Sequence, residues 1–497
     1  MEEKMNDQQR ARFEKLARYK ELGIDPFGSR YDWKDQIRDL VNQYGSADAE
    51  SFEANPVHVK VAGRLMALRK MGKAAFGNIQ DEYSKVQFWI GIQSVGEENY
   101  QVFKLSDLGD IAGLEGTLMK SKTGELTIRV THYTHISKCL NPLPEKFHGL
   151  TDPEERYRHR YVDLIVNEDS RKIAILRSKI VKQVRDYCDS LGFIEIETPV
   201  LSPIAGGAAA RPFITHHNTL DRDFYLRIAT ELNLKKAMIG GLDRVYEIGR
   251  IFRNEGIDTR HNPEFTTIEL YQAYGDLQSM REWMEGLMKT IAKNIIGSYQ
   301  IPWGDVVIDC EKPFRWISMA EAIKEKTGID FTEEISFEKA VELAKEHHVP
   351  LEKSWNSTGY IMQAFFDEFV EKDLIQPTFI HTYPIEVSPL TKKTSDPRFV
   401  ERFEFFIGGG EFSNSYTELN DPFDQMERFK AQLAAKERGD DEAEGIDETF
   451  MDAMRYGMPP AGGIGLGIDR LCMLFCNVQN IREVLLFPTM KDAGGNN

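Results

Sequence analysis

The chain has 497 residues, of which 41% are hydrophobic and 28% are charged, with a formal net charge of −17. This length predicts roughly two to four globular units with substantial cores. No apolar run approaches the roughly 18 residues that a membrane span needs, and the start MEEKMNDQQRARFEKL lacks the apolar core of a signal peptide. An acidic surface also repels a phosphate backbone, which argues against indiscriminate nucleic-acid binding. We therefore expect a cytoplasmic protein with neither a membrane nor DNA as a partner.

Cysteine usage narrows the class of protein further. The five cysteines are scattered, without a CxxC pair or a Cys/His cluster at zinc-finger spacing. Two of them lie four residues apart in an apolar helical stretch, where core packing is a simpler interpretation than metal binding. We expect reduced cysteines that serve mainly in packing: Cys139, Cys188, Cys310, Cys472 and Cys476.

The first predicted element is an amphipathic helix over residues 8–23, within an N-terminal helical extension of residues 1–56. Gly23 and then Pro26 end its pattern. Packing against the body of the protein is one interpretation of its apolar face, and contact with an RNA or another partner is the alternative. The apolar side chains at helical spacing are Phe13, Leu16, Tyr19 and Leu22.

From Val57 the hydrophobic period changes to that of strands. Several short alternating segments, separated by glycine-containing turns such as KTGE, lie between residues 57 and 145. This pattern predicts a small β-barrel of the OB-fold type, which presents one face to oligonucleotides. Residues 57–146 carry 12 Lys and Arg against 9 Asp and Glu, a net charge of +3, so this segment suits a polyanion that the whole chain does not attract.

The rest of the chain predicts a connector followed by a larger α+β region. Residues 146–169 mix proline with charge, as connectors between domains do. Residues 170–497 alternate helical patterns such as RSKIVKQVRDYCDSLG with strand patterns such as FIEIETPVL. A separate, mainly helical insertion is expected near residues 310–375.

The segment 252–274, FRNEGIDTRHNPEFTTIELYQAY, gathers charge around a turn between two predicted strands. One face of the strand pair carries Arg253, Glu255, Phe265 and Glu269, and the other face is apolar. A salt-bridged solvent face is one interpretation, but it does not explain the phenylalanine on the charged side. An arginine that forks onto a phosphate, an aromatic ring that stacks on a purine and a carboxylate that accepts from an amine together describe a nucleotide site.

A glycine-rich segment near the C-terminus gives a second, weaker signal. Gly463, Gly465 and Gly467 alternate along an apparent strand, which leaves room for a ligand against its backbone. Asp469 and Arg470 then begin an apolar helix. Neither the Rossmann fingerprint nor the P-loop pattern is present, so the glycines alone do not identify a ligand.

A third signal lies in residues 402–421, RFEFFIGGGEFSNSYTELND. Glu404 and Glu411 could supply the hard oxygen ligands that Mg²⁺ prefers. Asn414 and Glu418 follow at a spacing of four in a polar stretch. Isolated carboxylates are more often surface charges, so these residues alone do not predict a metal site, and other segments of the chain must support it.

Together these segments resemble the three signature motifs of class II aminoacyl-tRNA synthetases, and nearly the whole chain is similar to the bacterial lysyl-tRNA synthetase family. GFIEIETPVLSP resembles the first motif, FRNEGIDTRHNPEFTTIELYQAY the second and GGIGLGIDR the third. The resemblance implies an α+β protein, with an N-terminal OB-fold barrel that binds the anticodon in residues 57–145 and an antiparallel catalytic sheet flanked by helices in residues 170–497.

The resemblance also implies an ATP site in which Arg253 holds the α-phosphate, Phe265 stacks on adenine and Glu255 contacts its amino group. Arg260 and His261 would meet the outer phosphates. Arg253 and Arg470 would be the catalytic residues, and Glu404 and Glu411 would hold Mg²⁺. The implied ATP ligands are Arg253, Glu255, Arg260, His261, Asn262, Phe265 and Arg470.

A substrate ammonium taken out of water needs a buried carboxylate, and in the family Glu418 fills that role. An aspartate pocket, the nearest rival in the subclass, would instead present cations, so the acidic set favours lysine. The implied lysine ligands are Gly206, Gly207, Glu231, Glu269, Tyr271, Asn414 and Glu418. On the barrel, the implied anticodon contacts are Arg69, Phe76, Gln87 and Glu125, with a base stacked on the phenylalanine.

Four positions depart from the usual family pattern. Thr230 and Asn233 replace a proline and a tyrosine, and Gly410 and Ser413 replace an arginine and a smaller residue. These positions flank the implied pocket, but they leave its named ligands intact.

The resemblance implies a two-step reaction in which ATP activates L-lysine and the lysyl group then passes to the 3′ end of tRNA(Lys). It also implies a homodimer with the first motif at its interface. A ligase for another amino acid or for a protein lysine, and a non-catalytic tRNA-binding protein, are the alternatives. The anticodon barrel argues against a protein-modifying ligase, and the intact arginines and carboxylates argue against a non-catalytic protein.

Overall fold

The computed structural model describes residues 5–144, 150–204, 206–208, 210–437 and 446–491. The chain forms two compact units, Met1–Lys172 and Ile173–Asn497. Within the described ranges, no helix is both long and apolar enough to cross a membrane. All five cysteines lie in these ranges as free thiols, and Cys188, Cys310 and Cys472 are buried.

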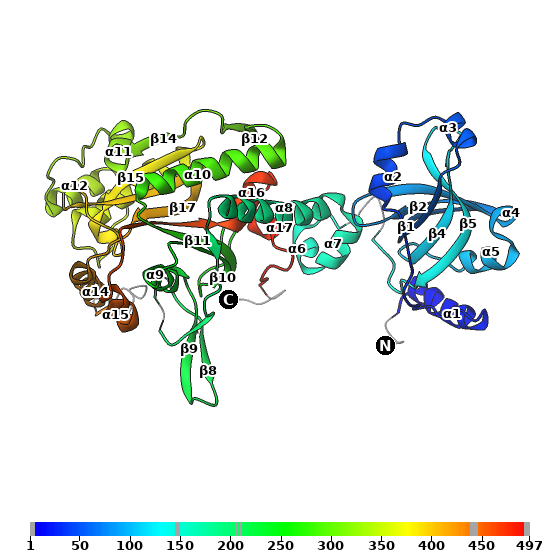
Figure 1. Cartoon of the computed structure of the whole chain (residues 1–497), viewed down its shortest axis with the longest axis horizontal. Coiled ribbons are helices and arrows are strands. Elements are labelled where there is room, and N and C mark those ends of the chain that lie inside the picture. The colour runs from blue at the N-terminus through cyan, green and yellow to red at the C-terminus, as the bar shows by residue number, and fades with distance from the viewer. Residues whose placement is uncertain (1–4, 145–149, 205, 209, 438–445, 492–497) are drawn as a thin grey trace. The chain divides into compact units, whose positions relative to one another are not determined.

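The first unit is built around a closed five-stranded barrel with the strand order β1-β2-β3-β5-β4 (Figure 1). Alternate side chains of these strands face the core, as in β2, where Ala75 and Ile79 are fully buried. This barrel confirms the predicted OB-fold. Its elements are β1 (His58–Met71), β2 (Ala74–Gln80), β3 (Lys85–Gly91), α4 (Ile92–Val95), α5 (Glu97–Lys104), β4 (Ile111–Lys120) and β5 (Leu126–Ser137).

Helix α1 (Asp7–Glu21) packs on the barrel, and two of its side chains, Arg12 and Tyr19, are buried there. The guanidinium of Arg12 donates to the backbone carbonyls of Leu108 and Cys139 at 3.0 and 2.8 Å. The ring of Tyr19 is fully buried and stacks on His135 at 4.1 Å. Helices α2 (Ile37–Tyr44) and α3 (Ala49–Ala54) complete the N-terminal segment.

The predicted connector contains helices α6 (Pro153–Arg158) and α7 (Arg160–Val166), and residues 145–149 lie outside the described ranges. Asp163 anchors this segment because its buried carboxylate pairs with Arg156 at 3.0 Å and with Arg160 at 2.7 Å.

The second unit contains an eight-stranded sheet with the order β14-β15-β16-β17-β18-β11-β10-β6. Its strand pairs are antiparallel except at the two ends, where β14 runs parallel to β15 and β6 to β10. The mainly antiparallel sheet expected from the sequence is therefore present. The strands are β6 (Ile194–Glu195), β10 (Arg244–Phe252), β11 (Glu264–Ala273), β14 (Arg315–Ser318), β15 (Thr378–Pro384), β16 (Phe399–Ile407), β17 (Gly410–Thr417) and β18 (Ala461–Gly467).

Helices α8 (Glu168–Ser190), α10 (Leu277–Ile291) and α16 (Ile468–Phe475) run along this sheet (Figure 1). Trp283 and Leu287 of α10 and Leu471 of α16 join Leu270 of β11 and Leu466 of β18 in one large apolar cluster. This cluster covers one face of the sheet, so the other face of its central strands is left for the polar side chains of the site.

The segment near 310–375 contains three helices and a strand. β14 joins the edge of the sheet, which the expectation of a mainly helical insertion did not include. Ile323, Phe365 and Phe366 belong to a separate apolar cluster that holds the helices together. These helices are α11 (Met319–Thr327), α12 (Phe337–Glu346) and α13 (Thr358–Phe369), followed by η3 (Glu371–Asp373).

Shorter elements surround the central sheet. Strands β8 and β9 form a hairpin that projects from the second unit (Figure 1). The remaining elements are β7 (Leu201–Ser202), β8 (Ile214–His217), β9 (Arg222–Leu226), α9 (Glu231–Ile239), η2 (Ala292–Ile296), β12 (Gln300–Trp303), β13 (Val306–Asp309), η4 (Ile385–Val387), α14 (Pro422–Glu437), α15 (Glu448–Arg455) and α17 (Ile481–Val484).

Candidate active site

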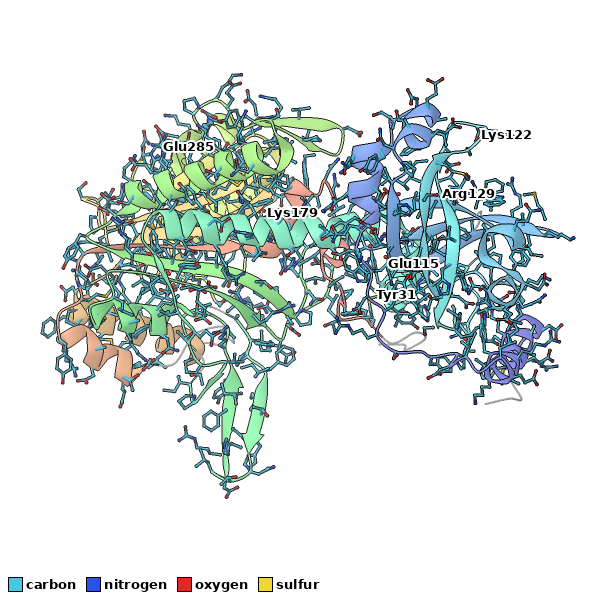
Figure 2. The ribbon with its side chains drawn as sticks, turned by 45° about the vertical axis from the view of Figure 1, so that its right-hand side comes forward. Tyr31, Glu115, Lys122, Arg129, Lys179 and Glu285 are labelled. Atoms are coloured by element: carbon cyan, nitrogen blue, oxygen red, sulfur yellow. The ribbon has the colours of Figure 1, made fainter. Side chains whose placement is uncertain are left out.

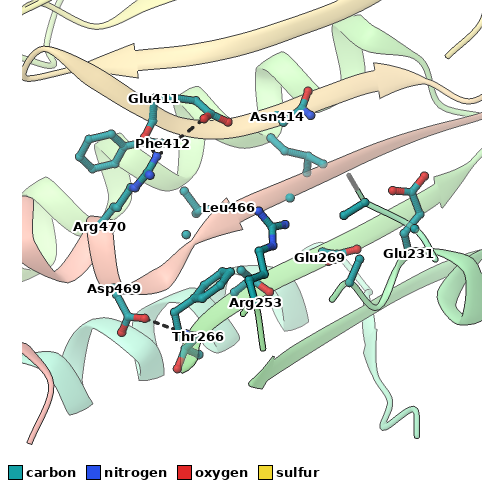
Figure 3. A pocket seen from close by; sticks show the side chains of 18 of the residues that line it. Glu231, Arg253, Thr266, Glu269, Glu411, Phe412, Asn414, Leu466, Asp469 and Arg470 are labelled. Carbon is teal, nitrogen blue, oxygen red and sulfur yellow. Dashed lines mark hydrogen bonds and ion pairs between the residues drawn. The ribbon is translucent and has the colours of Figure 1, made fainter. Parts of the chain in front are cut away.

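A pocket of about 520 Å³ lies on the polar face of strands β11, β17 and β18 (Figure 3). Its volume is in the range of small-molecule sites. The pocket brings together most of the residues that the sequence singled out. Those that line it are Gly207, Glu231, Arg253, Glu255, Arg260, His261, Asn262, Phe265, Glu269, Tyr271, Glu411, Asn414 and Arg470.

Gly206, Glu404 and Glu418 do not line this pocket. Gly206 directly precedes Gly207, whose φ of +91° is a backbone conformation that suits glycine. A Cβ atom on Gly207 would also lie only 3.2 Å from the Cβ atom of Ala229. Gly207 therefore allows a close backbone approach at this wall of the pocket.

Gly463, Gly465 and Gly467 of β18 form part of the pocket floor, and their neighbours come close to different degrees. A Cβ atom on Gly463 would lie 2.1 Å from Glu418 Oε1 and 2.5 Å from the ring of Tyr271. A Cβ atom on Gly465 would lie 3.6 Å from the side chain of Glu269, which is ordinary contact. Only the first of the two glycines is therefore required by its neighbours.

Arg253 and Phe265 face each other at one end of the pocket. The guanidinium carbon lies 5.3 Å from the ring centroid, which is a cation–π contact. The buried Nε of Arg253 has no hydrogen-bond partner among the described groups. A buried donor without a partner favours an anionic ligand at this point.

The prediction that Arg253 and Glu255 belong to a strand was wrong. Strand β10 ends at Phe252, and both residues lie in the loop that follows. The backbone N–H of Arg253 still donates to Pro263 O at 2.9 Å, so the loop remains paired at its base. Glu255 is exposed, and its side chain lines the pocket from this loop.

The turn after β10 holds cationic groups in place through its own carboxylate. Asp258 accepts from the backbone N–H groups of Arg260 and His261 at 2.6 and 2.7 Å, and from His261 Nδ1 at 2.8 Å. The guanidinium of Arg260 donates to Gly409 O at 3.2 Å. Arg470 lies 3.3 Å from His261 Nε2 and donates to Glu411 O at 2.6 Å. These contacts gather the charges expected to meet the outer phosphates.

Asn262 has a structural contact as well as a position in the pocket wall. Its side-chain N–H donates to Glu264 O at 2.6 Å, while its buried Oδ1 has no partner among the described groups.

Asp469, which the sequence analysis did not assign, fixes the neighbouring strand. It accepts from Thr266 N at 2.7 Å and pairs with Arg177 at 2.5 Å.

The opposite end of the pocket is acidic and buried. Glu231, Glu269 and Glu418 are exposed by 5%, 9% and 0%. Burial raises the pKa of Glu269 to about 7, with a smaller contribution from Glu231, although the N–H of Thr230 donates to it at 3.1 Å. Burial likewise raises the pKa of Glu418 to about 8, against the opposing effect of Lys235. Such carboxylates favour a cationic ligand that replaces their lost solvation.

Two aromatic hydroxyls and one lysine support these carboxylates. Tyr416 donates to the two oxygens of Glu231 at 2.8 and 2.7 Å, and Tyr271 donates to Glu269 at 3.3 Å. Lys235 pairs with Glu231 and with Glu418. Sequence reasoning missed Tyr416 and Lys235, because the sequence alone does not show that a tyrosine in a strand or a lysine in a helix is buried.

The two proposed metal ligands lie on neighbouring strands, but they differ in how strongly other side chains already bind them. Glu404 pairs with Arg402 at 2.5 Å and accepts from Tyr383 at 2.8 Å, whereas Glu411 is partly exposed and 3.7 Å from Arg470. Burial raises the pKa of Glu404 to about 7, with Arg402 opposing and Glu411 adding to the effect. Carboxylate crowding of this kind suits a divalent cation.

Two more carboxylates contribute to this crowding. Burial together with Glu411 raises the pKa of Asp367, and burial, Asp367 and Glu411 raise that of Glu371. No group of three His, Cys, Asp or Glu residues with metal-binding geometry exists within the described part of the chain. The residues present therefore fit Mg²⁺ only if phosphate and water complete its ligand shell, as Mg²⁺ commonly requires.

Asn414 connects the two halves of the site. Its Oδ1 accepts from Arg402 Nε at 2.9 Å, and Arg402 also donates to Val387 O at 2.7 Å. Arg402 was not predicted from the sequence, although it orients both Asn414 and Glu404.

On the barrel, the implied anticodon residues lie close together: Arg69, Phe76 and Gln87 are on adjacent strands, and Glu125 directly precedes β5. Arg69 pairs in register with Phe76, and Phe76 with Trp89. Gln87 donates to Glu125 at 2.7 Å. The row continues to Arg129, labelled in Figure 2, whose guanidinium carbon lies 5.8 Å from the Trp89 ring centroid. Trp89 and Arg129, which the sequence analysis left unassigned, extend this aromatic and cationic row.

Comparison with known proteins agrees with this architecture. A family model described as tRNA synthetases class II (D, K and N) matches residues 152–491, and one described as OB-fold nucleic acid binding domain matches residues 59–136. The lysine-tRNA ligases of Streptococcus sanguinis (strain SK36) and Streptococcus agalactiae serotype III (strain NEM316) are both 54% identical to the chain over 490 residues. That of Streptococcus pneumoniae (strain CGSP14) is 52% identical over the same length.

Each of these alignments covers 98% of the chain and 99% of the relative. Because the synthetase model covers most of the chain and the relatives align over nearly all of it, the chain belongs to the lysine-tRNA ligase family of class II aminoacyl-tRNA synthetases.

Proposed function

We propose that the pocket joins L-lysine to AMP with release of pyrophosphate, and that the lysyl group is then transferred to the 3′ end of tRNA(Lys). The observation that carries this proposal is the acidic end of the pocket, where three buried carboxylates suit a substrate with ammonium groups. Glu418 would take the side-chain ammonium with Tyr271. Glu231 and the Gly206-Gly207 backbone would take the α-amino group, supported by Glu269.

The cationic end suits ATP. Phe265 would stack on adenine, Glu255 would accept from its amino group, and Arg253 would hold the α-phosphate together with the lysine carboxylate. Arg260, His261 and Arg470 would meet the remaining phosphates, while Asn262 shapes the wall beside them. The partnerless Nε of Arg253 supports an anion at that position.

The chemistry needs no covalent nucleophile. The lysine carboxylate attacks the α-phosphorus in line, a bond to phosphorus forms as the bond to pyrophosphate breaks, and Arg253 and Arg470 neutralise the charge that develops. Asn414 would orient the lysine carboxylate. Catalysis of this kind depends on positioning and on electrostatics, both of which the pocket supplies.

Glu404 and Glu411 would hold Mg²⁺ against the phosphates. The crowding of carboxylates at this point supports the assignment. The ion would supply charge neutralisation at the phosphate oxygens.

The barrel would recognise the anticodon through Arg69, Phe76, Gln87 and Glu125. Phe76→Ala is expected to lower kcat/KM for tRNA in aminoacylation about tenfold or more, because stacking one base contributes roughly 1–3 kcal/mol. Lysine-dependent ATP–pyrophosphate exchange without tRNA is the internal control and should not change. An equal loss in both reactions would contradict the assignment.

We also propose a homodimer in the cytoplasm, with the first-motif region at the dimer interface. Exposed apolar side chains there support it: Ile194 at 50%, Val200 at 40% and Leu201 at 44% exposure. Sedimentation of the full chain at micromolar concentration should give twice the mass of one chain, and a stable monomer that remains active would overturn the dimer.

Amino-acid-dependent ATP–pyrophosphate exchange, with Mg²⁺ and each amino acid in turn, tests the central proposal. Exchange with lysine alone is expected. Exchange with a different amino acid would assign the pocket to that substrate, and no exchange by the folded protein would favour a tRNA-binding role without activation.

A further inference from the structure

Lys235 is a buried cation inside the acidic end of the pocket. It lies on α9 one turn after Glu231, is fully buried, and places its Nζ 2.5 Å from Glu231 Oε1 and against Glu418 Oε2. Aromatic rings surround it, with centroids 5.7 Å away for Tyr271 and 5.5 Å away for Tyr416. A buried ammonium stays charged only if nearby negative charges compensate for its lost hydration, and here the two carboxylates do so.

The two carboxylate oxygens of Glu418 have different surroundings. Oε2 faces Lys235, whereas Oε1 lies beside Gly463, which lines the pocket floor. Neither oxygen has a hydrogen bond of ordinary geometry among the described groups, so the ion pair is what orients this carboxylate. Oε1 thereby lies on the side of Gly463, directly behind the pocket floor, although Glu418 itself does not line the empty pocket. Tyr416 and Lys235 hold Glu231 from the same side.

The charges of this end match the substrate. Among the described residues, the charged side chains that face one another here are Glu231, Glu269 and Glu418 and one cation, Lys235, with Arg253 toward the other end. Three carboxylates and one ammonium leave two negative charges. Lysine brings two ammonium groups to this end, and its carboxylate meets Arg253. Without Lys235 the same site would hold an excess carboxylate, at a high desolvation cost.

We infer that Lys235 is a positioning and specificity-determining residue, which turns Oε1 of Glu418 toward the substrate and sets the pocket's charge to match the two ammonium groups of lysine. This inference rests on the proposed function. It goes further because Lys235 touches neither substrate nor ATP in that scheme. Its effect passes through Glu231 and Glu418.

Removing the charge should weaken lysine binding and change its pH dependence. Burial lowers the pKa of Lys235, but Glu231 and Glu418 outweigh burial and raise it. Its loss in Lys235→Met raises the pKa of Glu418 further, so Glu418 is ionised only at higher pH. In ATP–pyrophosphate exchange at pH 7.5 we expect KM for lysine to rise at least about tenfold, with KM for ATP unchanged. The acid limb of kcat/KM for lysine should also move to higher pH.

Lys235→Arg separates charge from position. It keeps the cation, so the acid limb should stay where the wild type has it, but its longer planar head group displaces both carboxylates and KM for lysine should rise severalfold. Lys236→Met is the matched control, because its side chain pairs at the periphery with Asp447 at 2.8 Å and should leave both parameters unchanged.

The outcomes separate the two proposals. No lysine-dependent exchange by the wild type overturns the proposed function itself. Normal exchange by the wild type, with unchanged KM for lysine and an unchanged acid limb in Lys235→Met, overturns the role of Lys235. If Lys235→Met does not fold, Lys235→Arg decides alone: a raised KM for lysine with an unmoved acid limb supports the inference, and an unchanged KM overturns it.

Discussion

The two ends of the pocket use charge in opposite ways. At the cationic end, Arg260 is exposed on a loop and Arg470 is only partly covered, so water solvates both guanidinium groups. At the acidic end, proposed to bind lysine, Glu231 and Glu418 are buried. The cost of desolvation is therefore small at one end and large at the other. This difference makes the lysine end the part of the site that is sensitive to pH and to single substitutions of its neighbours.

The largest expected effect comes from breaking the cationic end. Arg253→Ala should lower kcat for lysine-dependent exchange about 10²- to 10³-fold, because it removes a charge that acts on the developing transition state. Arg250→Ala is the matched control, since Arg250 is exposed on β10 and pairs loosely with Glu264 at 3.5 Å. Near-normal exchange in Arg253→Ala would remove this residue from the mechanism.

Breaking the acidic end should act on binding. Glu418→Gln leaves Lys235 with one carboxylate and deprives the substrate ammonium of its counter-ion, so KM for lysine should rise on the order of 10²-fold in steady-state exchange. KM for ATP should stay within a few-fold, which distinguishes this variant from Arg253→Ala. Glu448→Gln on the exposed start of α15 is the control. A parallel rise in both KM values would indicate general damage to the site.

A pH series sharpens the comparison without any substitution. Glu269 and Glu418 have pKa values of about 7 and 8, and in the proposed site both are ionised when lysine binds. Lysine affinity should therefore rise by up to about 50-fold from pH 6 to 7 and by about a further tenfold from pH 7 to 8, whereas affinity for ATP changes little. Calorimetric titration with lysine and separately with a non-hydrolysable ATP analogue measures both. A lysine affinity independent of pH would contradict the buried-carboxylate assignment.

The same shifts affect stability. A carboxylate whose pKa is raised on folding contributes stability that is present at low pH and is lost as the pH rises through the folded-state value. The ligand-free protein should therefore lose stability between about pH 5 and 9, and added lysine should raise the Tm more at pH 9 than at pH 6. Thermal melts with and without lysine test this sign.

The smallest predicted effect concerns a departure from the family pattern. The N–H of Thr230 donates to Glu269, and a proline at this position has no N–H to donate. Thr230→Pro should raise the pKa of Glu269 and increase KM for lysine a few-fold near pH 7, with less effect at pH 9. Asn233→Tyr, the other departure on the same segment, is the comparison variant. A lower KM for lysine in Thr230→Pro would show that this hydrogen bond does not favour the ionised carboxylate.

Much of the fold could be predicted because it depends on local periodicity. The alternation in the barrel and in β11 placed Phe265 and Glu269 on one face, as the structure has them. The end of β10 at Phe252 could not be predicted, because alternating residues continue past it and the loop is fixed by a contact with Pro263. Strand β14 was missed for a similar reason, since four residues give no period and its parallel partner β15 lies far along the chain.

The residues of the candidate site also fall into those that the sequence pattern could predict and those that only the folded structure reveals. Residues within recognisable motifs, such as Arg253 and Arg470, could be named from the sequence. Arg402, Tyr416 and Lys235 could not, because their importance lies in contacts between distant segments, such as Tyr416 with Glu231. A lysine in an amphipathic helix is usually solvated, and only the folded chain shows that Lys235 is not.

Gly463 has a consequence for inhibitors that compete with lysine. Any side chain at this position would overlap Glu418 and the ring of Tyr271, since a Cβ atom alone would lie 2.1 and 2.5 Å from them. A compound that draws its affinity from the backbone of β18 would therefore contact a position at which drug resistance cannot arise by simple replacement. Resistance would have to come from substitutions at residues farther from the strand. A compound could be designed to make no contact with those residues.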